Sequence, residues 1–242
     1  MADALDRNWE GVKAVIFDVD GTLYAQAPLR RKMLLDLIGY YGLRPWRVGE
    51  LLLLRRFRAE REKHASAAAQ NLESAQYEWC AHATGYSVQQ VRRVIDQWIF
   101  RHPTQYLAGC TYPGTHAFFA ALRANGIKIG IYSDYPAHEK LAAMGLQADV
   151  VISSTDPEVN AFKPDSRGLR HLAAQFGLAP EDCLFIGDRP ELDGACAAQA
   201  AMPFLLVENQ PFADFTFFHR LHRSFFDHSL RAYSHEPHVL LT

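Results

Sequence analysis

An apolar strand that ends in two aspartates constrains this chain more than any other feature of its sequence. The segment reads VKAVIFDVDGT, so the mostly apolar run Val12–Phe17 leads directly to Asp18, Asp20 and Gly21. A short apolar run bounded by Asp and Gly is typical of a buried strand. Alternate side chains of an extended chain share a face, so both carboxylates can point the same way. Because a buried carboxylate is costly without compensation, we expect a cation or a reaction here.

Strands and helices alternate in the second half of the chain. Helical patterns separate four further apolar runs, which we predict as strands: Ile127–Tyr132, Asp149–Ser153, Cys183–Ile186 and Pro203–Val207. Continuous apolar strands that alternate with helices favour a parallel sheet covered on both faces. The expected fold is therefore α/β, with a Rossmann-like, doubly wound parallel sheet as its core.

The region between the first and second strands has a different pattern. Apolar residues such as Met33, Leu37 and Tyr41 recur at helical spacing, and we expect roughly four helices and no strand between Pro28 and Arg101. This block interrupts the α/β pattern just after the first strand. We therefore predict a core domain of residues 1–24 and 108–242, with an inserted α-helical cap domain of residues 25–107. The place of the tail after about residue 208 is left open.

Composition and charge narrow the setting. The 242 residues carry a formal net charge of -2, which gives no reason to expect binding to nucleic acid or to a membrane. The four cysteines are scattered without C-x-x-C spacing, and the N-terminal residues are polar. No segment approaches 18 apolar residues in succession. We expect a cytoplasmic protein with reduced thiols, either a monomer or a homodimer.

Reactive side chains follow several of the predicted strands. Ligands of open parallel sheets bind beyond the carboxyl ends of the strands. The polar residues expected at that edge come from four separate segments: Asp18 and Asp20, Ser133, Lys163, and Asp188 with Asp193. Two carboxylates about 4 Å apart repel by roughly 4 kcal/mol at an effective dielectric constant near 20. A group of carboxylates without nearby His or Cys suits a hard cation, and Mg²⁺ is the ion that we expect.

These segments resemble the four motifs of the haloacid dehalogenase-like hydrolase superfamily. The motifs occur in the family's order as DVDGT from Asp18, Ser133 after a strand, Lys163, and GDRPELD from Gly187 to Asp193. The resemblance extends from about Val12 to Val207, with room for one helical cap between the first and second motifs. It implies a phosphatase-type hydrolase that cleaves a small phosphorylated metabolite, a phosphomonoester, with Mg²⁺ as cofactor.

The resemblance also implies roles for the acidic residues. Asp18 would be the nucleophile that attacks phosphorus and forms an aspartyl-phosphate. Asp20 would protonate the leaving oxygen and then take a proton from the attacking water. Asp18, the backbone carbonyl of Asp20, and Asp188 would hold Mg²⁺, and Asp193 would support the ion through water or a neighbour.

The phosphoryl group would be bound by other motif residues. Ser133 and Lys163 would contact its oxygens, Gly21 would let the backbone approach closely, and Thr22 would steady the turn by hydrogen bonding. Many relatives have Asn after the motif serine where this chain has Asp134, which suggests a change in how the edge of the site meets substrate.

Three alternatives share the same fold. A sugar phosphomutase would use the same core residues and differ in whether water reaches the aspartyl-phosphate. A 2-haloacid dehalogenase would attack carbon without a metal, and it needs no equivalent of Asp20 or of the Asp188 and Asp193 pair. A non-catalytic binding module would be expected to have lost one of the key aspartates, and none is missing.

Arginines in the cap raise the question of substrate contacts. The segment LLLLRRFRAEREKH, residues 51–64, contains Arg55, Arg56, Arg58 and Arg61 between glutamates, and we interpret it as a solvated helix face. Arg30, Arg31 and Tyr24 lie nearer to the entry into the cap and are better candidates for reaching substrate.

The C-terminal tail is rich in aromatic residues and histidine. Phe218, Leu221 and Phe225 share one helical face, and we expect this face to pack on the core. A metal site is a weaker interpretation, since the five histidines of the tail have no accompanying carboxylate or cysteine pattern: His219, His222, His228, His235 and His238.

Overall fold

A five-stranded parallel sheet forms the centre of the protein. The computed structural model describes residues 9, 11–65, 70–208 and 210–226. The strand order is β3-β2-β1-β4-β5, and every neighbouring pair is parallel. The strands are β1 Ala14–Phe17, β2 Lys128–Ser133, β3 Val150–Ser153, β4 Cys183–Gly187 and β5 Phe204–Leu206. All five lie within a residue or two of the predicted runs.

The register of the central strands brings the motif residues to one edge. Phe17, the last residue of β1, is level with Ile131 of β2 and Ile186 of β4. Asp18 therefore emerges beside the ends of both neighbouring strands. The convergence predicted from the strand ends follows directly from this register.

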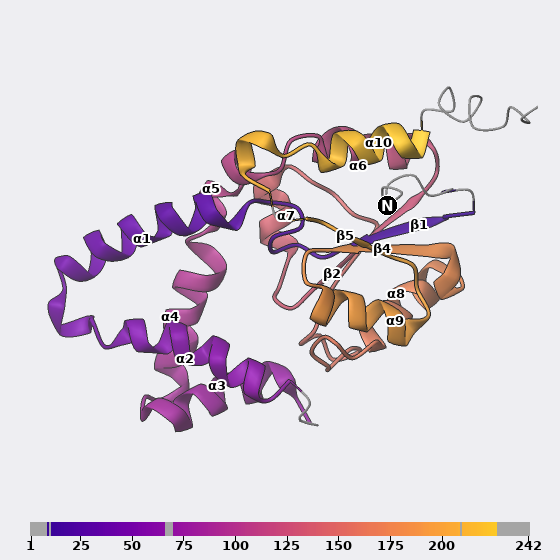
Figure 1. Ribbon diagram of the computed structural model, residues 1–242. Coiled ribbons are helices and arrows are strands. Elements are labelled where there is room, and N and C mark those ends of the chain that lie inside the picture. Colours follow the sequence, from indigo (N-terminus) through magenta and orange to yellow (C-terminus); the bar gives the residue numbers. More distant parts are fainter. Residues whose placement is uncertain (1–8, 10, 66–69, 209, 227–242) are drawn as a thin grey trace, which may run out of the picture.

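Helices cover both faces of the sheet (Figure 1). One face carries α6 and α10, which lie side by side, together with α7, and the other carries α8 and α9. Their bounds are α6 Thr115–Ala124, α7 His138–Met144, α8 Arg167–Phe176, α9 Ala195–Ala200 and α10 Phe217–Phe226. A separate apolar cluster fills the space on each side of the sheet. The predicted Rossmann-like α/β fold is confirmed.

The segment between β1 and α6 is helical in its described residues. It contains α1 Gln26–Gly42, α2 Glu50–Lys63, α3 Leu72–Thr84, α4 Val88–Ile95, a π-helical segment Asp96–Arg101 and the short α5 Thr104–Leu107. Helices α1 to α4 project away from the sheet in Figure 1. They enclose their own apolar cluster, which includes Leu53, Phe57 and Trp98. The expectation of about four helices without a strand therefore agrees with the described part of this region, which we call the cap.

Two crossings connect the cap to the sheet domain. Tyr24, on the outgoing crossing, forms an isolated antiparallel bridge with Thr111 on the returning one. The Ala25 N–H also donates to the Cys110 carbonyl over 2.9 Å. The crossings are thus held side by side, close to the expected boundaries at residues 24 and 108, which remain our proposed domain limits.

Helix α8 begins later than predicted. We expect a helix from Pro164, but the first helical residue is Arg167. The Asp165 carboxylate accepts a hydrogen bond of 2.9 Å from the Arg167 N–H. A side chain that bonds the backbone two residues ahead favours a turn over a helix, so the helix starts only beyond it.

The described part of the tail, up to residue 226, packs on the core as expected. Phe218, Leu221 and Phe225 are buried on α10, and Phe118 of α6 contacts two of them with ring centroids 6.0 and 5.7 Å away. His228, His235 and His238 lie outside the described residues. All four cysteines are free thiols with buried side chains. In the described ranges, no helix has the length and apolar character needed to cross a membrane.

Candidate active site

A buried lysine stands between two aspartates at the edge of the sheet. The Lys163 Nζ donates to Asp18 Oδ1 over 2.7 Å and to Asp193 Oδ1 over 2.8 Å. Lys163 is 2% exposed, so this contact takes place away from solvent. Thr22 Oγ1 donates to the other Asp18 oxygen over 3.1 Å. The Asp18 carboxylate is therefore oriented by a donor on each oxygen.

Three carboxylates form a tight cluster around this point. Oxygens of Asp18, Asp188 and Asp193 all lie within 4.8 Å of one another. Burial raises the pKa of Asp18, with further contributions from Asp193 and Asp188, against the opposing effect of Lys163. Burial and the charge of Asp193 raise the pKa of Asp188 to about 6. One lysine does not neutralise three carboxylates, so the oxygen donor set fits an additional hard cation.

Glycine at position 21 is required by the same cluster. Gly21 has φ of +107°, a conformation that L side chains rarely adopt. A Cβ at this position would lie 2.2 Å from Asp188 Oδ2. The backbone therefore passes against the carboxylate cluster at a distance that only glycine permits.

Asp20 is held by a different set of partners. The Lys140 Nζ donates to both Asp20 oxygens, at 2.6 and 2.7 Å, and the Tyr24 hydroxyl donates to Oδ1. Burial by itself would raise the pKa of Asp20, but Lys140 and then Tyr24 outweigh it and lower that pKa. The Asp20 carbonyl accepts a hydrogen bond of 2.6 Å from Gln26 Nε2. The two aspartates of the DVDGT motif thus have separate lysine partners.

Ser133 ends β2 with its side chain fully buried. Its hydroxyl oxygen accepts a hydrogen bond of 3.3 Å from the Tyr135 N–H. The next residue, Asp134, accepts a hydrogen bond of 3.0 Å from Ser154 Oγ. The acidic side chain that replaces the usual Asn is therefore tied to the loop after β3.

A cavity of about 980 Å³ lies between this edge of the sheet and the cap. Four predicted residues line it directly: Asp18, Asp20, Lys163 and Asp193. The remaining predicted residues lie next to these. Thr22 bonds Asp18, Gly21 contacts Asp188 in the carboxylate cluster, and Ser133 precedes the lining residue Asp134. The structure therefore gathers all of the predicted site residues at one end of the cavity.

The contacts that Lys140 and Tyr24 make with Asp20 were not predicted from the sequence. Lys140 is 5% exposed and shares the buried face of α7 with Leu141 and Met144. The Tyr24 contact with Asp20 was likewise not foreseen, although Tyr24 was considered as a substrate contact. The sequence signal that could have identified Lys140 is its register with apolar residues of the same helix.

The interpretation of Arg61 as part of a solvated face was wrong. Arg61 is 6% exposed and lines the cavity, whereas Arg55 and Arg58 line it with exposed side chains. Its position follows Leu53 and Phe57 at intervals of four, which places it on the buried face of α2. Glutamates flank Arg61 on both sides, and this alternation of charge is typical of a solvated helix face.

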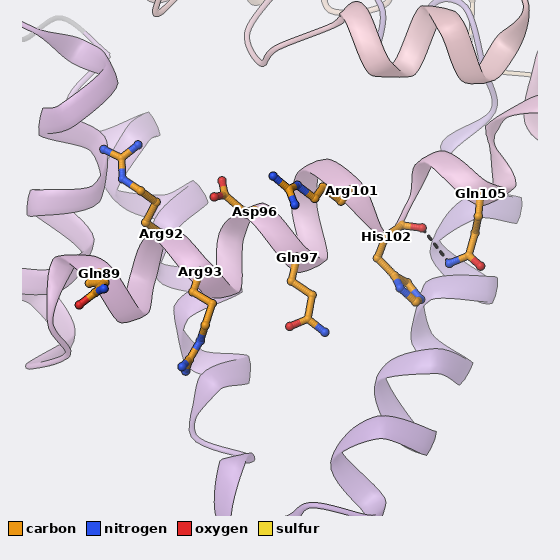
Figure 2. A pocket seen from close by; sticks show the side chains of 8 residues that line it. All are labelled: Gln89, Arg92, Arg93, Asp96, Gln97, Arg101, His102 and Gln105. Carbon is orange, nitrogen blue, oxygen red and sulfur yellow. Dashed lines mark hydrogen bonds between the residues drawn. The ribbon is translucent and has the colours of Figure 1, made fainter.

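A second cavity of about 680 Å³ lies in the cap and is lined by polar residues of α4, the π-helical segment and α5 (Figure 2). Three of its titratable groups already have partners: Arg92 pairs with Glu73, Arg93 with Glu50, and His102 with Asp36. The side chains in Figure 2 do not converge on one point. None of them belongs to the carboxylate cluster, so the chemistry is expected in the first cavity.

Comparison with known proteins decides the family. The family model for haloacid dehalogenase-like hydrolases matches residues 12–201. The chain belongs to this family. The match covers β1 to α9, and the cap is inserted inside it.

Individual relatives of this hydrolase carry different activities. It is 30% identical over 210 residues to a phosphoglycolate phosphatase of Rhodospirillum rubrum, which covers 81% of this chain and 79% of that protein. It is 24% identical to a glyceraldehyde 3-phosphate phosphatase of Methanothermobacter thermautotrophicus, covering 82% and 87% of the two chains. A 2-haloacid dehalogenase structure from Pseudomonas syringae superposes with a TM-score of 0.61 at 17% identity, over 92% of this chain and 99% of that one. At 17% identity, the match to the dehalogenase structure shows only that the two proteins share a fold.

Proposed function

We propose that this hydrolase is a Mg²⁺-dependent phosphatase that cleaves a phosphomonoester through an aspartyl-phosphate on Asp18. The observation that carries the proposal is the arrangement of Asp18, which lies among two further carboxylates and within bonding distance of Lys163. The 30% identity to a phosphoglycolate phosphatase supports the same reaction class. We also propose the roles of the site residues given below, the domain limits at residues 24 and 108, and Mg²⁺ as the cofactor.

The first step uses Asp18 as nucleophile. One carboxylate oxygen attacks phosphorus, the bond from phosphorus to the leaving oxygen breaks, and the leaving oxygen takes a proton as the alcohol departs. Thr22 and Lys163, which bond the two Asp18 oxygens, hold the carboxylate in place for this attack. In the second step water attacks the same phosphorus, which releases phosphate and restores the Asp18 carboxylate.

Asp20 serves the proton transfers of both steps. Its carboxyl group lines the cavity and is held by the Lys140 ammonium. The leaving oxygen takes its proton from the Asp20 carboxyl group, and the attacking water later gives one back to the Asp20 carboxylate. Tyr24 fixes the direction of the Asp20 carboxylate. Lys140 is therefore a positioning residue for Asp20.

The phosphoryl oxygens require positive charge and hydrogen-bond donors. Lys163 supplies a buried ammonium, and Ser133 supplies a hydroxyl at the end of β2. Gly21 lets the backbone after Asp20 approach the phosphoryl group.

Asp18, the Asp20 carbonyl and Asp188 would hold Mg²⁺, and Asp193, which bonds Lys163, would support the ion. The three carboxylates fit this ion because they are oxygen donors that lie within 4.8 Å of one another. When bound, Mg²⁺ contributes positive charge that offsets the negative charge of the phosphoryl oxygens.

The test is phosphate release from a panel of phosphate esters, with and without a chelator, by the native protein and by Asp18→Asn. We expect release that depends on Mg²⁺ and that disappears in the variant. Full activity in chelator or in Asp18→Asn would refute the mechanism. Halide release from a 2-halo acid would favour the dehalogenase alternative, and a need for a sugar bisphosphate activator would favour the phosphomutase.

A further inference from the structure

A buried arginine of the cap has only neutral partners. The Arg61 guanidinium donates to the Asp134 carbonyl over 2.6 Å and to Gln76 Oε1. It also lies over the rings of Tyr135 and Phe162, with its central carbon 4.4 and 4.2 Å from the ring centroids. Within the described residues no carboxylate lies within ion-pair distance of it.

The position of Arg61 ties this charge to the catalytic edge. Asp134 directly follows Ser133, and Phe162 directly precedes Lys163. Arg61 therefore reaches from α2 of the cap to the two loops that carry the proposed phosphoryl-binding residues. A buried cation without a counter-ion is unfavourable, and an anionic group of a ligand in the cavity would remove that penalty.

The other charged side chains on the cap side of the cavity also favour an anionic ligand. Four arginines and one glutamate of α1 and α2 line the cavity: Arg30, Arg55, Arg58, Arg61 and Glu62. None of the four arginines forms an ion pair with an acidic side chain in the part of the chain that the structure describes. By contrast, Arg47, Arg92 and Arg93 of the cap pair with Glu50 or Glu73. The wall of the cavity thus offers uncompensated positive charge.

The same wall is largely apolar between these charges. Side chains from α1, α2 and the π-helical segment form this surface: Met33, Leu37, Leu51, Leu54, Trp98 and Ile99. Together with the catalytic edge they enclose about 980 Å³, near the upper end of the roughly 300–1,000 Å³ that is typical of sites for drug-sized ligands. A leaving group of two or three carbons would leave most of this apolar surface in contact with water.

We propose that the substrate is an amphiphilic phosphomonoester, whose leaving group combines an apolar body with a second anionic group bound by Arg61. This inference rests on the proposed phosphatase function and names its substrate class. The phosphoryl group lies at Asp18, the second anionic group lies against Arg61 where the cap meets the core, and the apolar body lies between α1 and α2.

Three esters separate the parts of this proposal. Benzyl phosphate has the apolar body alone, 2-phosphoglycolate has the second anion alone, and 3-carboxybenzyl phosphate has both. With native protein and Mg²⁺ we expect kcat/KM for 3-carboxybenzyl phosphate to exceed that of either other ester by about tenfold or more. In Leu54→Asn the preference for 3-carboxybenzyl phosphate over 2-phosphoglycolate, measured as the ratio of the two kcat/KM values, is expected to fall by about threefold or more.

Variants at Arg61 test the charge directly. Arg61→Met should raise KM for 3-carboxybenzyl phosphate by about 10- to 100-fold and change KM for benzyl phosphate less than about threefold. Arg61→Lys should recover part of the loss. Arg56→Met is the matched control, since Arg56 is exposed on the same helix and does not line the cavity.

A measurement on native protein covers the case in which Arg61→Met does not fold. The inhibition constant of 3-carboxybenzylphosphonate should be about tenfold lower than that of benzylphosphonate. Equal inhibition by the two phosphonates, or a preference for 2-phosphoglycolate over both benzyl esters, would overturn the substrate class and leave the phosphatase function standing. Failure to hydrolyse any phosphate ester would overturn the proposed function and this inference with it.

Discussion

The two sides of the main cavity differ in whether their charged side chains form ion pairs within the protein. On the catalytic side, three of the carboxylates that line the cavity have an ammonium partner: Lys163 for Asp18 and Asp193, and Lys140 for Asp20. The Lys163 contacts are buried, the Lys140 contact is partly buried, and all of them connect segments that are distant in sequence. The catalytic side is therefore organised before any ligand arrives.

The cap side has cations that lack such partners. Arg61 is buried against neutral groups, and Arg55 and Arg58 of the same helix have no ion pair in the described residues. The difference suggests a division of labour. Under the proposed function, the groups that perform the reaction on every substrate are fixed by internal ion pairs, whereas the groups that would select the substrate have no acidic partner among the described residues.

The largest expected effect tests the catalytic side. Asp18→Asn should lower kcat for phosphate release by roughly 10⁴-fold or more, because the amide is a poor nucleophile. Phosphate release from benzyl phosphate measures the change, and circular dichroism checks the fold. Asp182→Asn is the control, since that carboxylate pairs with Lys13 and is not part of the cavity. If Asp18→Asn keeps a tenth of the native activity, Asp18 is not the nucleophile, and the proposed role of the catalytic side is wrong.

The second prediction separates the apolar cluster of the cap from that of the core. Phe57→Ala should destabilise the cap by about 3–5 kcal/mol, because Phe57 is fully buried in the cap's own cluster. Hydrogen exchange should then accelerate in α2 to α4 while β1 and β4 stay protected. The equivalent core change, Phe118→Ala, should affect the sheet domain instead. Uniform loss of protection in both variants would mean that the two regions unfold as one unit.

The third prediction concerns the ion pair that was missed in the sequence. Lys140→Met should lower kcat by about 10²- to 10³-fold with a smaller change in KM, because Asp20 loses the group that positions it. Lys140→Arg should restore part of kcat. A rise in KM alone would show that Lys140 contacts substrate and does not act through Asp20.

The smallest expected effect is the stabilisation of the fold by Mg²⁺. Mg²⁺ at about a hundredfold excess over its Kd should stabilise the fold by about 2.7 kcal/mol, measured as a rise in Tm. Because the pKa of Asp188 is raised to about 6, protons compete with the ion below that pH, so the gain should be smaller at pH 5 than at pH 7.5. Asp188→Asn should reduce the gain at pH 7.5, and an unchanged gain in that variant would place the ion elsewhere.

The sequence predicted the catalytic side far better than the cap side. Strand ends are local features, and parallel pairing brings them together, so Asp18, Lys163 and Asp193 could be placed without coordinates. Arg61 and Lys140 could not, because a charged residue on a helix is ordinarily assigned to solvent. Both lie in register with apolar residues of their helices, but only tertiary contacts show that the side chains are buried. Only the structure pairs Lys140 with Asp20 across 120 residues.

Tyr24 belongs to the hinge and to the catalytic pair at the same time. Its backbone joins the two crossings through Thr111, and its hydroxyl fixes Asp20. A rotation of the cap about these crossings would turn the tyrosine ring and so redirect the carboxylate. Under the proposed mechanism, one side chain would then couple the placement of the cap to the orientation of Asp20 that proton transfer requires.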